Sequence, residues 1–170
     1  MNWEAVTAIS TACTGAVILA TAIVSLRQLR QFEVQRRDAA SLELMRSLQD
    51  QTFSHAFRVI VSLPEGASAA ELRARGAEFE EAAQLLALRF ENLGVLAYRG
   101  TVAFEIISEL AGGGIVGIWS RLKDTARETR ERMRYPMYLE WFQWLAEQLE
   151  ARERLNERPA HERLKDWRSS

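Results

Sequence analysis

Charged residues are missing from one segment near the N-terminus and frequent in the rest of the chain. Residues 5–26 read AVTAISTACTGAVILATAIVSL, which is 22 residues without an acid or a base. A helix rises about 1.5 Å per residue, so this segment matches the roughly 30 Å hydrocarbon core of a bilayer. We therefore predict one transmembrane helix here. A buried helix of a soluble domain is an alternative, as is a signal peptide, although residues 1–4 carry an acid and no base.

The charges that flank this segment predict its orientation. Only Glu4 precedes it, whereas four arginines follow it: Arg27, Arg30, Arg36 and Arg37. Positive charge next to a span stays on the cytoplasmic side. We therefore expect a single-pass protein of the inner (cytoplasmic) membrane, with its N-terminus outside and its C-terminal domain in the cytoplasm.

Small residues recur along one face of the predicted span. They are Ala8, Ala12, Gly15, Ala16 and Ala20. Small side chains at this spacing let two helix backbones approach closely, which predicts a docking face for a second transmembrane helix. A segment rich in alanine also produces such a row by chance, and both interpretations stay open.

Beyond the span, apolar residues recur every three to four positions, and no strand-like alternation extends over any length. The pattern predicts an all-α protein. A juxtamembrane exit helix is expected over residues 27–63, with a kink near residues 50–52. A small helical cytoplasmic domain follows over residues 64–155. Residues 156–170 are a charged tail with one short helical turn within residues 162–167.

Turn and cap signals divide the helical domain. Ser68 and Glu71 have the spacing of a capping box, which predicts a helix start at that point. The glycine triplet at residues 112–114 lacks the Gly-Lys-Ser/Thr ending of a phosphate loop, so it is interpreted as a helix C-cap and hinge. These signals predict helices over residues 69–98, 102–110, 115–134 and 137–155.

Composition and motifs disfavour several classes of function. The net charge is −1, so no overall field favours nucleic acid. The single cysteine, Cys13, cannot form an internal disulfide. The two histidines, His55 and His161, lie far apart in sequence, and the helical zinc and di-iron motifs do not occur. We expect a non-catalytic protein without a cofactor or metal.

Two acidic residues come nearest to a catalytic pattern. Glu105 and Glu109 lie one turn apart on a predicted helix, and two close carboxylates can share a proton or bind a cation. The alternative is that they form structural ion pairs with Arg89 or Arg99, or face water. The structural interpretation is the expected one, because ion-pair networks perturb pKa values as well.

An aromatic stripe in the last helix predicts a core face. Tyr138, Trp141, Phe142 and Leu145 recur at helical spacing, which is typical of packing in the core. Trp144 points elsewhere on the helical wheel and is predicted to contact a partner.

The chain resembles a family of small bacterial membrane proteins of unknown function. The resemblance rests on the RQLR of residues 27–30, the FENLGVL of residues 90–96, the helix that contains Trp119 and the YLEWF of residues 138–142. It implies one N-terminal span, an arginine-rich exit helix and a helical cytoplasmic domain. It implies no catalytic residues.

We therefore expect an accessory or scaffold subunit of a larger bacterial membrane complex, docked through its span and its helical domain. Its partners would be an integral membrane protein and lipid. The basic run between Arg121 and Arg134 is interspersed with acids and is typical of a solvated helix face, with contact to anionic lipid head groups as the alternative. The alternative is a self-associating signalling or defence component, which would be a homo-oligomer. An enzyme of unrecognised type built on Glu105 and Glu109 is the third hypothesis.

Overall fold

The computed structural model describes most of the chain beyond residue 49. The described residues are 50–155 and 160–168, with Thr21, Val24, Ser25, Arg27, Gln28, Glu43 and Arg46 before them. Contacts divide the chain into two units, residues 1–40 and residues 41–170, and all the helices given below belong to the second unit. Apart from three residues, the predicted span over residues 5–26 lies outside the described part. Within the described part, no helix has both the length and the apolar character needed to cross a bilayer.

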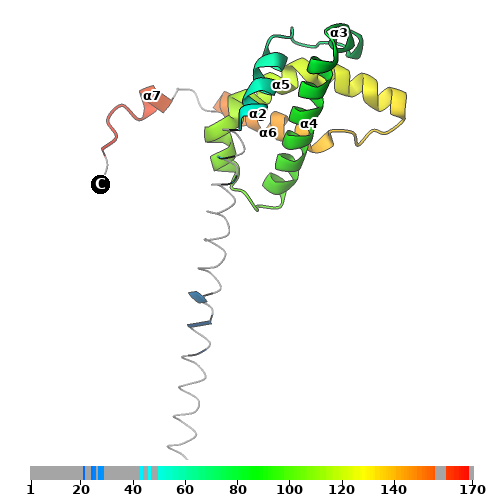
Figure 1. Ribbon diagram of the computed structural model, residues 1–170. Coiled ribbons are helices and arrows are strands. Elements are labelled where there is room, and N and C mark those ends of the chain that lie inside the picture. Colours follow the sequence, from blue (N-terminus) through cyan, green and yellow to red (C-terminus); the bar gives the residue numbers. More distant parts are fainter. Residues whose placement is uncertain are drawn as a thin grey trace, which may run out of the picture. The chain divides into compact units, whose positions relative to one another are not determined.

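The described part is all-helical, as predicted, and no strand occurs in it. Its helices are α2 (Gln51–Val61), α3 (Ala69–Ala74), α4 (Ala77–Tyr98), α5 (Phe104–Met133), α6 (Glu140–Leu155) and α7 (Ala160–Arg163). α4 packs against both α2 and α6, and α5 packs against α6 (Figure 1). The result is a small bundle in which four helices share one core.

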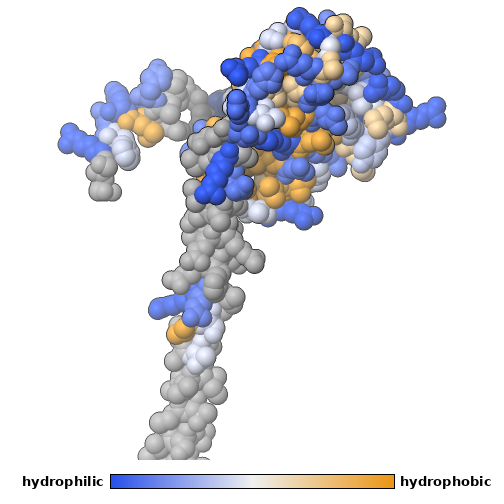
Figure 2. Space-filling view, in the orientation of Figure 1, coloured by the Kyte–Doolittle hydropathy of each residue, from blue (hydrophilic) through white to orange (hydrophobic). Residues whose placement is uncertain are grey.

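The core is formed by large apolar side chains from α2, α4, α5 and α6. Phe90 of α4 lies at its centre, with its ring centroid 6.0 Å from that of Phe53 and 5.1 Å from that of Phe142. The fully buried members include Ile60, Leu86, Phe90, Ile107, Ile115, Ile118, Phe142, Leu145 and Leu149. Each such side chain contributes about 1.5–3 kcal/mol on transfer from water. Apolar atoms also reach the surface between polar ones over α4 (Figure 2).

The predicted capping box is confirmed, but the helix that it begins is short. The Glu71 backbone N–H donates to Ser68 Oγ at 3.2 Å, and the Ser68 backbone N–H donates to Glu71 Oε2 at 2.8 Å. The bonds that the Glu71 carboxylate accepts from the Ser68 backbone N–H and then from the Ser68 hydroxyl hold the pKa of Glu71 below its usual value. The single helix predicted over residues 69–98 is wrong. Gly76 adopts φ +100°, a left-handed conformation that favours glycine, and separates α3 from α4.

The predicted hinge at residues 112–114 is also wrong, because α5 runs through all three glycines. Each glycine costs a helix about 1 kcal/mol relative to alanine, which tertiary packing readily offsets. Ile107, Ile115 and Ile118 on either side of the triplet are fully buried. The buried face of α5 is therefore continuous across the glycines.

One further boundary lies where it was expected, and two others differ from the predicted ones by two or three residues. α2 begins after Asp50, whose side chain accepts from the Thr52 backbone N–H at 3.4 Å, and this is where the exit helix was expected to kink. α6 begins at Glu140 rather than at Met137, because Leu139 adopts φ +55° and interrupts the helix. In the tail, α7 begins two residues before the expected helical turn.

Candidate functional site

The residues predicted to contact a partner fall in two different places. Ala8, Ala12, Gly15, Ala16 and Ala20 lie outside the described residues. Trp144 is described and lies in α6, where it is half-buried.

Trp144 belongs to a partly exposed cluster of three aromatic rings, which we call the aromatic cluster: Tyr98, Trp141 and Trp144. The Tyr98 ring centroid lies 4.9 Å from that of Trp141 and 5.9 Å from that of Trp144. The two tryptophan rings are 6.1 Å apart in a near-perpendicular arrangement. Tyr98 is 65% exposed, and Trp141 is half-buried, although the sequence predicted Trp141 for the core. These distances are those of favourable aromatic pairs.

A close crossing of α4 and α6 positions the aromatic cluster. Gly94 lies against the backbone of Trp141: a Cβ on Gly94 would come 2.7 Å from the Trp141 carbonyl carbon. Real Cβ atoms essentially never come this close to backbone, so the crossing requires glycine at residue 94. Since Tyr98 follows one turn later in α4, the same crossing brings its ring onto the two tryptophans.

A carboxylate from α4 fixes the start of α6 at this crossing. Glu91 Oε2 accepts a hydrogen bond from the Phe142 backbone N–H at 2.8 Å. The first turn of a helix leaves such N–H groups without partners in the helix itself, and an acidic group also interacts favourably with the helix dipole there. Glu91 therefore replaces the local N-cap that α6 lacks.

The loop between α5 and α6 is held by one arginine. Arg130 donates from Nε to the Tyr138 carbonyl at 2.8 Å and from Nη1 to Gln143 Oε1 at 2.6 Å. Its Nη2 donates to the Leu139 carbonyl at 3.3 Å. Arg121 similarly donates from Nε to the carbonyls of Val61 and Leu63, both at 3.1 Å. Two members of the predicted basic run are thus used inside the domain.

The two acidic residues considered for catalysis, Glu105 and Glu109, are both exposed. Glu105 pairs with Arg152, at 3.2 Å, rather than with Arg89 or Arg99. A hydrogen bond from its own backbone N–H and then the bond from Arg152 hold the pKa of Glu105 below its usual value. Glu109 follows four residues later on α5 and forms no ion pair with another described residue. A carboxylate that shares a proton with another would have a raised pKa, whereas the pKa of Glu105 is lowered by the bonds from its own backbone N–H and from Arg152.

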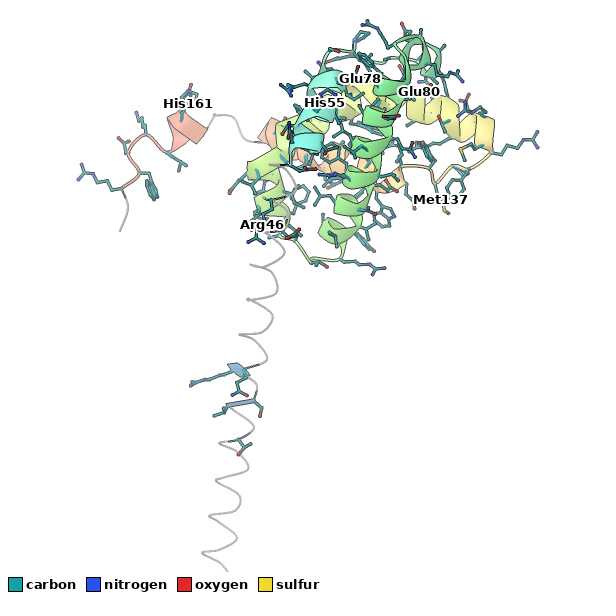
Figure 3. The ribbon with its side chains drawn as sticks, in the orientation of Figure 1. Arg46, His55, Glu78, Glu80, Met137 and His161 are labelled. Carbon is teal, nitrogen blue, oxygen red and sulfur yellow. The ribbon has the colours of Figure 1, made fainter. Side chains whose placement is uncertain are left out.

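Histidines and acids are scattered over the described residues. His55 Nε2 lies 3.0 Å from Glu78 Oε1, and both side chains are mostly exposed (Figure 3). Among the described residues, no group of three or more His, Cys, Asp and Glu side chains is placed to hold a metal ion.

A cavity of about 670 Å³ lies between α2 and the N-terminal half of α5. Its apolar wall includes the rings of Phe53, Phe57 and Phe90, and its opposite wall is the glycine triplet. Arg58 and Glu109 are the charged residues that line it. Sequence reasoning missed this cavity because it interpreted the triplet as a hinge.

The chain matches a known family over most of its length. The model of a family described as a domain of unknown function (DUF4760) matches residues 15–149. The match extends from within the apolar N-terminal segment into α6 and includes both the aromatic cluster and the cavity. The comparisons with curated proteins and with solved structures found no match.

Proposed function

The chain belongs to the DUF4760 family, and we propose that it is a non-catalytic accessory or scaffold subunit of a larger bacterial membrane protein complex. In this proposal, residues 5–26 span the inner membrane with the N-terminus outside. The face formed by the small residues of that span contacts an integral membrane partner. The helical domain contacts the partner's cytoplasmic surface through the aromatic cluster.

The aromatic cluster is the observation that carries this proposal. Interface hot spots are enriched in tryptophan and tyrosine, because these residues bring a large contact area with few rotatable bonds. Tyr98 leaves 65% of its surface exposed although its ring already contacts two tryptophans. A partner that covers the cluster would bury apolar ring surface at a site that the α4–α6 crossing has already ordered.

The use of the polar groups also favours an interaction protein over an enzyme. Asp50, Glu91, Arg121 and Arg130 each hold two segments of the domain together. Glu105, half of the carboxylate pair considered for catalysis, is engaged with Arg152. The polar groups with defined partners thus have structural roles, whereas Tyr98 still leaves most of its surface exposed after packing on the two tryptophans.

Site-specific photo-crosslinking in intact cells tests the proposal. A photoreactive phenylalanine analogue replaces Tyr98 in one variant and Glu81 in a control variant. Glu81 is also exposed on α4 and lies outside the aromatic cluster. We expect an adduct with one other membrane protein from residue 98 and none from residue 81.

Two outcomes would overturn the proposal. Equal adducts from both positions would mean that the aromatic cluster has no special contact. An adduct from residue 98 with a second copy of this chain alone would favour the self-associating signalling component instead.

A further inference from the structure

We propose that the cavity between α2 and α5 binds one zwitterionic amphiphile with a single acyl chain, such as a lysophospholipid. The chain would lie on the phenylalanine rings, the anionic group at Arg58 and the cationic group at Glu109. This inference is independent of the aromatic cluster and of the proposed membrane partner.

The size and lining of the cavity fit one apolar chain. Ligand pockets usually measure about 300–1,000 Å³ and are mainly apolar with a few polar groups. This cavity, at about 670 Å³, lies within that range and suits one acyl chain better than two. Phe53 and Phe90 are buried in its wall, while Phe57 is half-buried. The two rings of α2 lie 6.1 Å apart and form a continuous apolar surface.

Gly113 leaves part of the opposite wall bare. A Cβ on Gly114 would lie 3.3 Å from the Phe57 ring, so this glycine is partly explained by close packing. A Cβ on Gly113 would meet only Glu153 Oε1, at 3.5 Å, which is an ordinary contact. Gly113 is exposed and lines the cavity, so crowding by the described residues does not require glycine there. Its absent side chain keeps the cavity open and lets a ligand reach the helix backbone.

The charges at the cavity have opposite signs and come from opposite walls. Arg58 is contributed by α2 and Glu109 by α5. Both are exposed, and neither forms an ion pair with another residue in the described ranges. Glu153 of α6 adds a second carboxylate beside Gly113. One cation facing carboxylates complements a head group that carries both a phosphate and an ammonium.

The neighbouring charges are already engaged elsewhere. Arg89 donates to Asp50 at 2.8 Å, and Arg152 donates to Glu105 at 3.2 Å. Arg58 is therefore the cation that a phosphate in the cavity would meet. Guanidinium groups match phosphate geometry well, and charge-assisted hydrogen bonds of this kind are stronger than neutral ones.

Native mass spectrometry of the full chain in a non-ionic detergent tests the inference. Three probes share one acyl chain: lysophosphatidylethanolamine (zwitterionic), lysophosphatidylglycerol (anionic) and a monoacylglycerol (neutral). We expect one bound lysophosphatidylethanolamine per chain, with an affinity about tenfold above that of the other two, because only this head group satisfies both charges.

Variants locate the site. Gly113→Leu fills the cavity and should abolish binding, whereas Lys123→Leu, which adds the same side chain to an exposed position of α5, should leave it unchanged. Arg58→Gln and Glu109→Gln should each remove the preference for the zwitterion, and Arg99→Gln should not. Circular dichroism confirms that each variant is folded.

Three results would overturn the inference. Equal affinity for the three probes would show that the charges take no part. Unchanged binding by Gly113→Leu would place the ligand elsewhere. Absence of binding by all three probes would show that the cavity does not bind an amphiphile with one acyl chain. None of these results bears on photo-crosslinking from residue 98, so failure of this inference is distinguishable from failure of the proposed function.

Discussion

Gly94 of α4 and Trp141 of α6 are in backbone contact, and a Cβ on Gly94 would lie 2.7 Å from the Trp141 carbonyl carbon. This contact lets two helices cross without a side chain between them. It also sets the position of the exposed ring of Tyr98 above Trp141 and Trp144. The geometry of the proposed docking surface therefore depends on one residue without a side chain.

Gly94→Ala is expected to destabilise the domain. Replacement of glycine by alanine inside a helix normally stabilises the protein by up to about 1 kcal/mol. Forced overpacking, in contrast, destabilises it by about 1–3 kcal/mol. Here the clash is with rigid backbone, so we expect a net loss of about 1–2 kcal/mol in the free energy of unfolding. Denaturant unfolding followed by circular dichroism measures it. Gly117→Ala is the control, since its nearest neighbour is a flexible Arg121 atom at 3.8 Å. Equal changes in the free energy of unfolding for the two substitutions would contradict the close backbone contact of Gly94 with Trp141.

Removal of the Glu91 carboxylate, which belongs to α4 and caps α6, should loosen the start of α6. Glu91→Ala leaves the Phe142 backbone N–H without its acceptor, and loss of a helix cap costs about 0.5–2 kcal/mol. Glu91→Gln keeps an acceptor oxygen and should lose less. Amide hydrogen exchange at Phe142 distinguishes the variants, with faster exchange expected in Glu91→Ala. If exchange at Phe142 were equally slow in both variants and in the wild type, the cap would not exist in solution.

Arg130 should be irreplaceable by lysine. Its planar guanidinium donates to two carbonyls and one amide oxygen at once, and an ammonium on a flexible stem cannot reproduce that fork. We expect Arg130→Lys to increase hydrogen exchange across residues 135–140 and to cost about 1–3 kcal/mol. Arg132→Lys is the control, because Arg132 is exposed on the same helix. If residues 135–140 exchanged as slowly in Arg130→Lys as in the wild type, a positive charge alone would be sufficient to hold the loop.

Acid should weaken the junction of α2 and α4. The hydrogen bond from Arg89 is the largest cause that lowers the pKa of Asp50 below 3.8. A lowered folded-state pKa means that the stabilisation is complete above the unfolded value and is lost as pH falls through the folded value. Asp50→Asn keeps a good N-cap but removes the charge.

The free energy of unfolding of the wild type should therefore exceed that of Asp50→Asn by a constant amount above about pH 5, and the difference should shrink below about pH 4. Denaturant unfolding from pH 3 to pH 7 checks this, and Arg89→Gln should remove the same pH dependence. A difference that stays constant down to pH 3 would contradict the ion pair.

Local signals were enough to predict part of this fold. The Ser68–Glu71 capping box depends on two residues three positions apart, so sequence alone identifies it. The helical class likewise follows from periodicity. Gly112–Gly114 was misinterpreted because glycine propensity is a local preference, whereas burial on either side of the triplet decides the outcome. Gly76, which does end a helix, carries the same local signal.

The candidate site was harder to predict because it is made by contacts between distant segments. Trp144 was identified from its position on a helical wheel, but Tyr98 joins it only through the crossing of α4 and α6. The role of Glu91 depends on the N-terminus of a helix that begins 49 residues away, so no local pattern identifies it. Arg58 and Glu109 come to one cavity only because α2 packs on α5.

The most direct test of the proposed accessory role is extraction of the native protein in a mild detergent, followed by sizing and mass spectrometry of whatever accompanies it. We predict a defined complex that contains a different integral membrane protein in fixed proportion. Trp144→Ala should reduce the yield of that complex while the domain stays folded by circular dichroism. A free monomer, or an assembly of this chain alone, would contradict the account.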